Sequence, residues 1–122
     1  MDRATKLALV ILPLFLGACQ QARPPETTPM ALDGQAQQIA SLIAGTRYLK
    51  YQCGNSTLPT DGQIEQAAYA AAHQRGWQPP AGIAARSSEL YQQLLKDSTP
   101  RAAQCAEFQQ LLQPFLTTLP KA

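Results

Sequence analysis

A short apolar run near the N-terminus is the feature that most constrains how the rest of this chain can fold. Arg3 and Lys6 lead into ten residues, Leu7–Leu16, that are apolar apart from the interruption at Pro13. A membrane-spanning helix needs about 20 apolar residues, so this run is too short to be one. A basic start, a short apolar stretch and small residues before a cleavage point are typical of a secretory signal peptide. We therefore expect residues 1–18 to be removed and the remainder to fold outside the cytoplasm.

The residue after the expected cleavage point is a cysteine, Cys19, preceded by Leu16-Gly17-Ala18. This arrangement resembles a lipobox, in which the thiol is lipidated (palmitate among the attached chains) and the cysteine becomes the first mature residue. Two or more acyl chains anchor a protein stably to a bilayer. In lipoproteins of this kind, Gln20 in place of an aspartate implies export to the outer membrane. The alternative is an ordinary leader, cut near Ala18, that leaves Cys19 unmodified.

The length and charge of the mature chain limit what it can do. Residues 19–122 make up 104 residues, which is enough for one domain. Removing Asp2, Arg3 and Lys6 leaves 8 basic and 7 acidic residues, a net charge of about +1. The sequence contains no run of like charges, so nothing indicates nucleic-acid binding. It is rich in alanine, glutamine and leucine, which favours helices over strands.

Two cysteines remain once Cys19 is assigned to lipidation. Cys53 and Cys105 are expected to form a disulfide, because thiols pair in an oxidising compartment. Two free buried thiols are the alternative.

Residues 19–32 are expected to form a flexible tether between the lipid and a helical domain at 33–122. Pro24, Pro25 and Pro29 lie in this segment together with few apolar residues, a composition typical of an extended linker.

Four helices are predicted in the domain, the third of them short. The first should run from Asp33 or Gly34, with Asp33 as N-cap, to about Gln52. The second should begin near Asp61, a candidate N-cap, and end before Gly76, with Trp77 supplying the apolar contact that often follows such an end.

Proline and serine positions set the bounds of the other two helices. Residues 78–86 are predicted to form a loop, and Ser87 or Ser88 should cap a short third helix that ends near Lys96. Thr99 is the expected N-cap of the fourth helix, which has Pro100 at its first position. Pro114 should kink this helix or shorten its last hydrogen bonds.

The residues that catalysis or metal binding would need are scarce. His73 is the only histidine, so it has no second histidine with which to bind a metal. Asp61 and Glu65 are one turn apart, and they fit the favourable position of acidic residues at a helix N-terminus better than a catalytic pair. We therefore predict no enzyme activity, cofactor, metal or small-molecule substrate, and a function in binding another protein.

Three pairs of adjacent apolar residues exceed what one narrow helix face can bury. They are Leu42 with Ile43, Leu111 with Leu112 and Phe115 with Leu116. Neighbouring residues on a helix point about 100° apart, so one member of each pair can face away from the core. A wide buried stripe is one interpretation, and an exposed groove for an amphipathic partner helix is the other.

The sequence from Ala40 to Leu116 resembles the pilotins of type II secretion systems, small outer-membrane lipoproteins that escort the secretin. The matching features, in chain order, are Tyr48-Leu49-Lys50, Gln52-Cys53, Ser56, Leu58-Pro59, the alanines from Ala67 to Ala72, Gly76-Trp77, Cys105, Phe108 and Pro114-Phe115-Leu116. The resemblance spans nearly all of the mature domain and combines two cysteines with a lipobox.

The resemblance implies an all-α, four-helix domain stapled by the disulfide between Cys53 and Cys105. It also implies capture of the C-terminal segment of a secretin subunit, which becomes helical in an apolar groove, followed by delivery to the outer membrane, protection from degradation and aid in assembly. From helical position, we expect four leucines to contribute to the groove: Leu42, Leu49, Leu111 and Leu116. A different periplasm-facing lipoprotein adaptor or inhibitor that binds an amphipathic helix is the alternative function.

Overall fold

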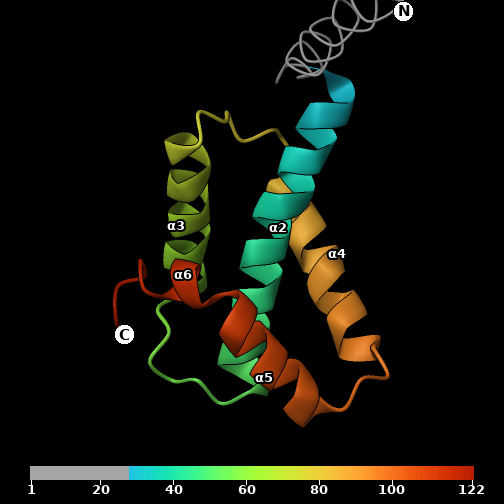
Figure 1. Ribbon diagram of the computed structural model, residues 1–122, viewed down its shortest axis with the longest axis vertical. Coiled ribbons are helices and arrows are strands. Elements are labelled where there is room, and N and C mark those ends of the chain that lie inside the picture. Colours follow the sequence, from blue (N-terminus) through green and yellow to red (C-terminus); the bar gives the residue numbers. More distant parts are fainter. Residues whose placement is uncertain (1–27) are drawn as a thin grey trace, which may run out of the picture.

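The computed structural model describes residues 28–122, which form helices joined by turns and loops (Figure 1). The predicted leader, Cys19 and most of the predicted tether lie outside these residues. The helices are α2 (Pro29–Gln52), α3 (Asp61–Gln74), α4 (Ile83–Lys96), α5 (Arg101–Leu111) and α6 (Gln113–Leu116). None of these helices is long and apolar enough to cross a membrane. The predicted all-α class is confirmed.

The long helix α2 is the centre of the domain, because α3, α4 and α5 each pack against it (Figure 1). Its residues Ile39 and Ile43 are 1 % and 0 % exposed and form the middle of the core. Ala68 and Ala72 of α3, Ile83 of α4 and Phe115 of α6 close this core from the other helices.

α2 begins four residues before the predicted start. Its N-cap is Thr28, whose hydroxyl accepts a hydrogen bond from the backbone N–H of Ala31, and Pro29 occupies the first helical position. Proline suits this position because its missing N–H would have no helical partner there. Asp33 is therefore not the N-cap, and its carboxylate instead binds Arg86 of α4 at 2.8 Å. The four residues from Pro29 to Leu32, assigned to the tether from the sequence, belong to the helix.

α3 starts where predicted, although its N-cap is Thr60 and not Asp61. Thr60 and Gln63 form a reciprocal capping box. At the other end, Gly76 adopts a positive φ of 78°, and the N–H of Trp77 donates to the carbonyl of Ala72 at 2.9 Å. This is the glycine-terminated helix end predicted from the sequence. It turns the Trp77 side chain back against the core.

α4 is longer than predicted. It has 14 residues and begins at Ile83, whereas the sequence indicated a short helix capped by Ser87 or Ser88. Gly82, with a φ of 84°, precedes the helix, and Ser87 is buried inside it with its hydroxyl donating to the carbonyl of Ala84. Ile83 is 3 % exposed, so burial in the core stabilises a first turn that has no side-chain cap.

The predicted fourth helix is divided in two. α5 ends at Leu111 and α6 follows from Gln113, with Pro114 in its first turn, where the missing N–H is tolerated. The cap of α5 is Pro100, not Thr99. Leu112 lies at the junction and packs over Gly45 of α2, where an added Cβ would come within 3.0 Å of the leucine side chain. The absence of a side chain at Gly45 thus lets the junction approach α2.

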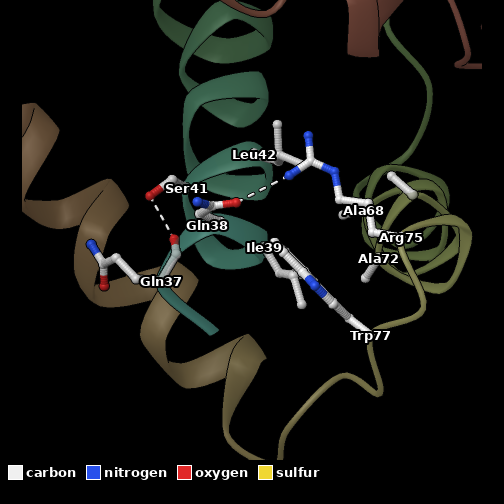
Figure 2. A pocket seen from close by; sticks show the side chains of 10 residues that line it. Gln37, Gln38, Ile39, Ser41, Leu42, Ala68, Ala72, Arg75 and Trp77 are labelled. Atoms are coloured by element: carbon white, nitrogen blue, oxygen red, sulfur yellow. Dashed lines mark hydrogen bonds between the residues drawn. The ribbon is translucent and has the colours of Figure 1, made fainter. Parts of the chain in front are cut away.

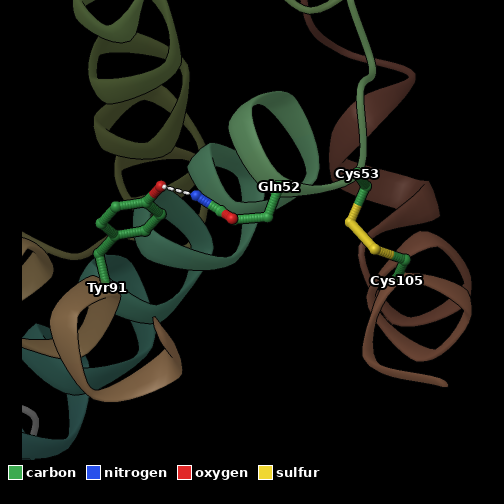
Figure 3. Close-up of a disulfide and its surroundings, with 4 residues drawn as sticks. All are labelled: Gln52, Cys53, Tyr91 and Cys105. Carbon is green, nitrogen blue, oxygen red and sulfur yellow. Dashed lines mark hydrogen bonds between the residues drawn. A yellow bond between two sulfur atoms is a disulfide. The ribbon is translucent and has the colours of Figure 1, made fainter. Parts of the chain in front are cut away.

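The predicted disulfide is present and links the C-cap of α2 to α5 (Figure 3). The Cα atoms of Cys53 and Cys105 are 5.8 Å apart. Nearby, the rings of Tyr48 and Phe108 meet edge to face at 5.5 Å. The bridge and this aromatic contact hold α5 against the C-terminal part of α2.

Candidate functional site

An elongated groove runs along the surface between α2 and α3 and continues to α5 and α6. It consists of two hollows of about 270 Å³ and 670 Å³ that share Leu42, Ala71 and Arg75 as lining residues. We call this surface the α2–α3 groove. The two hollows are neighbours that meet at these three residues.

The α3 side of the groove is made of small side chains. Alanines at positions 67, 68, 70, 71 and 72 contribute to it. Alanine has high helix propensity, so this wall needs no larger residue to remain helical. Small side chains also let another helix approach closely. The result is a largely apolar wall of small side chains.

The wider end of the groove is formed by the junction of α5 and α6. Phe115 is 7 % exposed and forms part of the floor, while Leu111 is 66 % exposed and stands at the rim. The packing of Leu112 over Gly45 explains this orientation, because the preceding leucine then points about 100° away, towards solvent.

The smaller hollow is bordered by Trp77, which follows the end of α3, and by Arg75, which the two hollows share (Figure 2). The Arg75 Nη1 atom donates a hydrogen bond to Oε1 of Gln38 on α2 at 3.2 Å. The same guanidinium lies over the Trp77 ring, 5.2 Å from its centroid. Arg75 thus reaches across the groove from α3 to α2.

The structure brings together two of the four leucines predicted to form the groove. Leu42 is half-buried and Leu111 exposed, and both line the wider hollow. The prediction was wrong for Leu49, which is 1 % exposed and belongs to the core. Leu116 lines a separate hollow, with Leu58 and others, near the C-terminus and does not line the α2–α3 groove.

The error at Leu49 has a simple geometric cause. Leu42 and Leu49 are seven residues apart and therefore share one face of α2. α5 packs across the C-terminal part of that helix, as the bridge at Cys53 and the contact at Tyr48 show. Leu42 is half-buried and lines the groove, whereas Leu49 is buried in the part of the helix where α5 packs, a difference that periodicity cannot reveal.

The sequence interpretation missed the part that Trp77 and Arg75 play in the groove. Gly76-Trp77 was identified as a helix end and as part of the family resemblance, and Arg75 had no assigned role. The available signal was the helix-ending glycine itself, because such ends bring the following apolar residue back against the helix.

Another hollow, of about 320 Å³, is lined by residues of α2, α4 and α5. Leu90, Leu94 and Phe108 contribute apolar surface, and Asp97 stands among its lining residues. The backbone N–H of Thr99 donates to the Asp97 carboxylate at 2.8 Å, and hydrogen bonding to Thr99 lowers the pKa of that carboxyl. This hollow does not share lining residues with the wider end of the α2–α3 groove.

The two acidic residues noted in the sequence have separate partners: Asp61 joins α3 to α2, and Glu65 pairs within α3. Asp61 accepts a hydrogen bond from the Tyr51 hydroxyl at 2.9 Å and lies within 4 Å of Lys50 and Arg47. Glu65 accepts from the Tyr69 hydroxyl, whose pKa is raised by burial and by this nearby carboxylate. In residues 28–122 no group of three or more His, Cys, Asp and Glu residues is placed to hold a metal ion.

Known proteins and a family model match nearly the whole domain. The family model described as type II secretion system pilotin lipoprotein (PulS_OutS) matches residues 16–117. The pullulanase secretion protein PulS of Klebsiella pneumoniae is 47% identical over 113 residues, covering 87% of each chain. Pilotin OutS of Dickeya dadantii is 40% identical over 114 residues, covering 87% of this chain and 86% of its own. A solved pilotin/secretin peptide complex is similar with a TM-score of 0.68 and 44% identity, over 70% of this chain and 92% of that one.

Proposed function

The chain belongs to the PulS_OutS family of type II secretion system pilotin lipoproteins, and from this premise we propose that its α2–α3 groove binds the C-terminal segment of a secretin subunit. The protein is therefore a secretion pilotin and not an enzyme. The observation that carries the proposal is the largely apolar groove formed by these two adjoining hollows, which is lined by Leu42 and exposed to solvent at Leu111.

The shape of the groove favours a helical partner. Amphipathic helices bind in apolar grooves through side chains spaced three or four residues apart. The alanines of α3 leave room for such a helix, and Leu111 at the rim is exposed apolar surface that it would cover. A secretin segment that becomes ordered only on binding gives up conformational entropy, so a few buried apolar anchors must supply the affinity.

We propose that the N-terminal region anchors the protein in the membrane. Cys19, outside the described residues, is proposed as the lipidated residue, and residues 20–28 as the connection to α2. A secretin subunit held in the groove would thereby be carried to the outer membrane and assembled there.

Replacing Leu111 with glutamate should abolish secretin capture and leave the fold intact. Leu111 is 66 % exposed, so a charge there costs the free protein little, whereas in the complex it would be buried against an apolar helix. The probe is a synthetic peptide of the last ~20 residues of the secretin from the same type II secretion gene cluster, which spans about 30 Å as a helix. The measurement is the Kd of this peptide by fluorescence anisotropy. We expect a loss of at least about 100-fold in affinity.

Leu95→Glu is the matched control. Leu95 is 43 % exposed and lies on α4, where it does not line the groove. It should bind the peptide with the affinity of the unaltered protein. Equal binding by Leu111→Glu and the control would show that the partner uses another surface, and an unaltered protein that fails to bind the peptide would refute the proposed function itself.

Replacing Cys19 with serine should separate binding from delivery. The variant lacks the thiol that accepts the lipid, yet it keeps the groove, so peptide affinity should not change. In cells, the secretin should no longer reach the outer membrane, as measured by immunoblotting of fractionated membranes. Normal delivery of the secretin by this variant would remove the reason for proposing the anchor.

A further inference from the structure

We propose that Arg75 is a specificity-determining residue of the α2–α3 groove and pairs with an acidic side chain of the bound secretin helix. This inference rests on the proposed function and adds to it the chemistry that the partner segment must carry.

Arg75 is the only charged residue among those that line the two hollows of the groove, and it lines both of them. The other polar lining residues are neutral: Gln37, Gln38, Ser41, Gln74 and Thr118. A surface that is otherwise uncharged therefore has one positive charge, where its two hollows meet.

The Arg75 guanidinium is held in place by neutral partners only. It donates to the Gln38 amide oxygen at 3.2 Å and stacks over Trp77 at 5.2 Å (Figure 2). Within residues 28–122 it has no ion pair. By contrast, three cations elsewhere in these residues do form ion pairs: Arg47 and Lys50 lie beside Asp61, and Arg86 binds Asp33.

Binding of a helix would change the surroundings of this charge. Arg75 is exposed in the free protein, and water satisfies the N–H groups that Gln38 does not. A wholly apolar helix laid over the groove would remove that water and leave a partly desolvated cation with Gln38 as its one hydrogen-bond acceptor, so that its other N–H groups would be unsatisfied, which is unfavourable. A carboxylate on the helix removes this penalty, because guanidinium and carboxylate form paired hydrogen bonds.

The inference defines the kind of segment that fits. It is an amphipathic helix with apolar residues towards the groove and an aspartate or glutamate beside that apolar face, within reach of Arg75. Such a residue fixes the register of the helix in the groove, since sliding by one turn would separate the two charges. The apolar anchors supply affinity and the charge pair supplies selectivity.

The test is a double-mutant cycle on the full-length protein extracted in detergent, with the same C-terminal secretin peptide as probe. Arg75→Gln is combined with peptides in which each acidic residue is replaced in turn by its amide. We expect Arg75→Gln to weaken binding by about five- to ten-fold and one peptide substitution to weaken it equally, with no further loss when the two are combined. Raising the salt concentration should weaken the unaltered pair more than the variant.

Two more variants separate a charge pair from a structural effect. Arg101→Gln removes an exposed cation of α5 that does not line the groove, and it should bind as the unaltered protein does. Arg75→Glu should bind poorly and regain affinity for the peptide in which the identified acidic residue is changed to arginine.

Equal affinities for Arg75→Gln and the unaltered protein, additive losses for every peptide substitution, or a binding-competent segment without acidic residues would each overturn the inference. These outcomes leave the proposed function standing as long as Leu111→Glu abolishes binding. Failure of the unaltered protein to bind the peptide would instead refute the proposed function.

Discussion

Replacing Cys53 and Cys105 together with alanine is expected to lower the free energy of unfolding by about 4 kcal/mol. The bridge joins residues 52 positions apart. Closing a loop of that length lowers the conformational entropy of the unfolded chain, which stabilises the folded state by about this amount. Small domains have only about 5–15 kcal/mol in total, so the double variant should be unfolded or close to it at 37 °C. Urea unfolding followed by circular dichroism measures the difference.

The structure indicates that α5 depends on this bridge more than the other helices do. Gln104 is the only buried residue of α5; the half-buried Phe108 meets Tyr48 of α2, and Cys105 forms the bridge. Because α5 leads into the junction that places Leu111 and Phe115 at the groove, loss of the bridge should also weaken peptide binding.

Adding a reductant to the unaltered protein serves as the control, and it should reproduce the loss of stability while leaving the double variant unaffected. A thermal melt of the unaltered protein that does not change with reductant would contradict this prediction.

Replacing Leu49 with alanine should destabilise the domain by roughly 2–5 kcal/mol. Leu49 is 1 % exposed, so the substitution removes buried apolar surface and leaves a cavity beside the C-terminal end of α2. The matched comparison is Leu111→Ala at the exposed rim, which should change stability by no more than about 0.5 kcal/mol. Urea unfolding of the two variants under the same conditions gives both values.

The substitutions at Leu49 and Leu111 should also differ in their effect on peptide affinity. At a temperature where Leu49→Ala is still folded, it should bind the secretin peptide with near-normal affinity, because Leu49 does not line the groove. Leu111→Ala should bind more weakly. A stable Leu49→Ala variant that has lost peptide binding would restore Leu49 to the groove and contradict the structure.

Sequence patterns were sufficient for the class of fold and for most helix ends, because these depend on neighbouring residues. The glycine-terminated end at Gly76 and the helix start at Asp61 require only local backbone chemistry. The early start of α4 was missed because Ile83 is stabilised by burial in a core formed by distant residues. Likewise, the local turn signals around Pro79 and Gly82 could not show that a helix begins directly after them.

The sequence by itself determined that the domain is helical and that Cys53 is available to pair with Cys105, because propensity and cysteine number depend on composition and local order. Only the tertiary structure decided which apolar residues remain exposed. Leu42 and Leu49 share one face of α2, yet α5 packs across one end of that helix and leaves the other open. Whether a residue belongs to the core or to a binding surface depends on which helix covers it, and that is set by contacts between segments far apart in the chain.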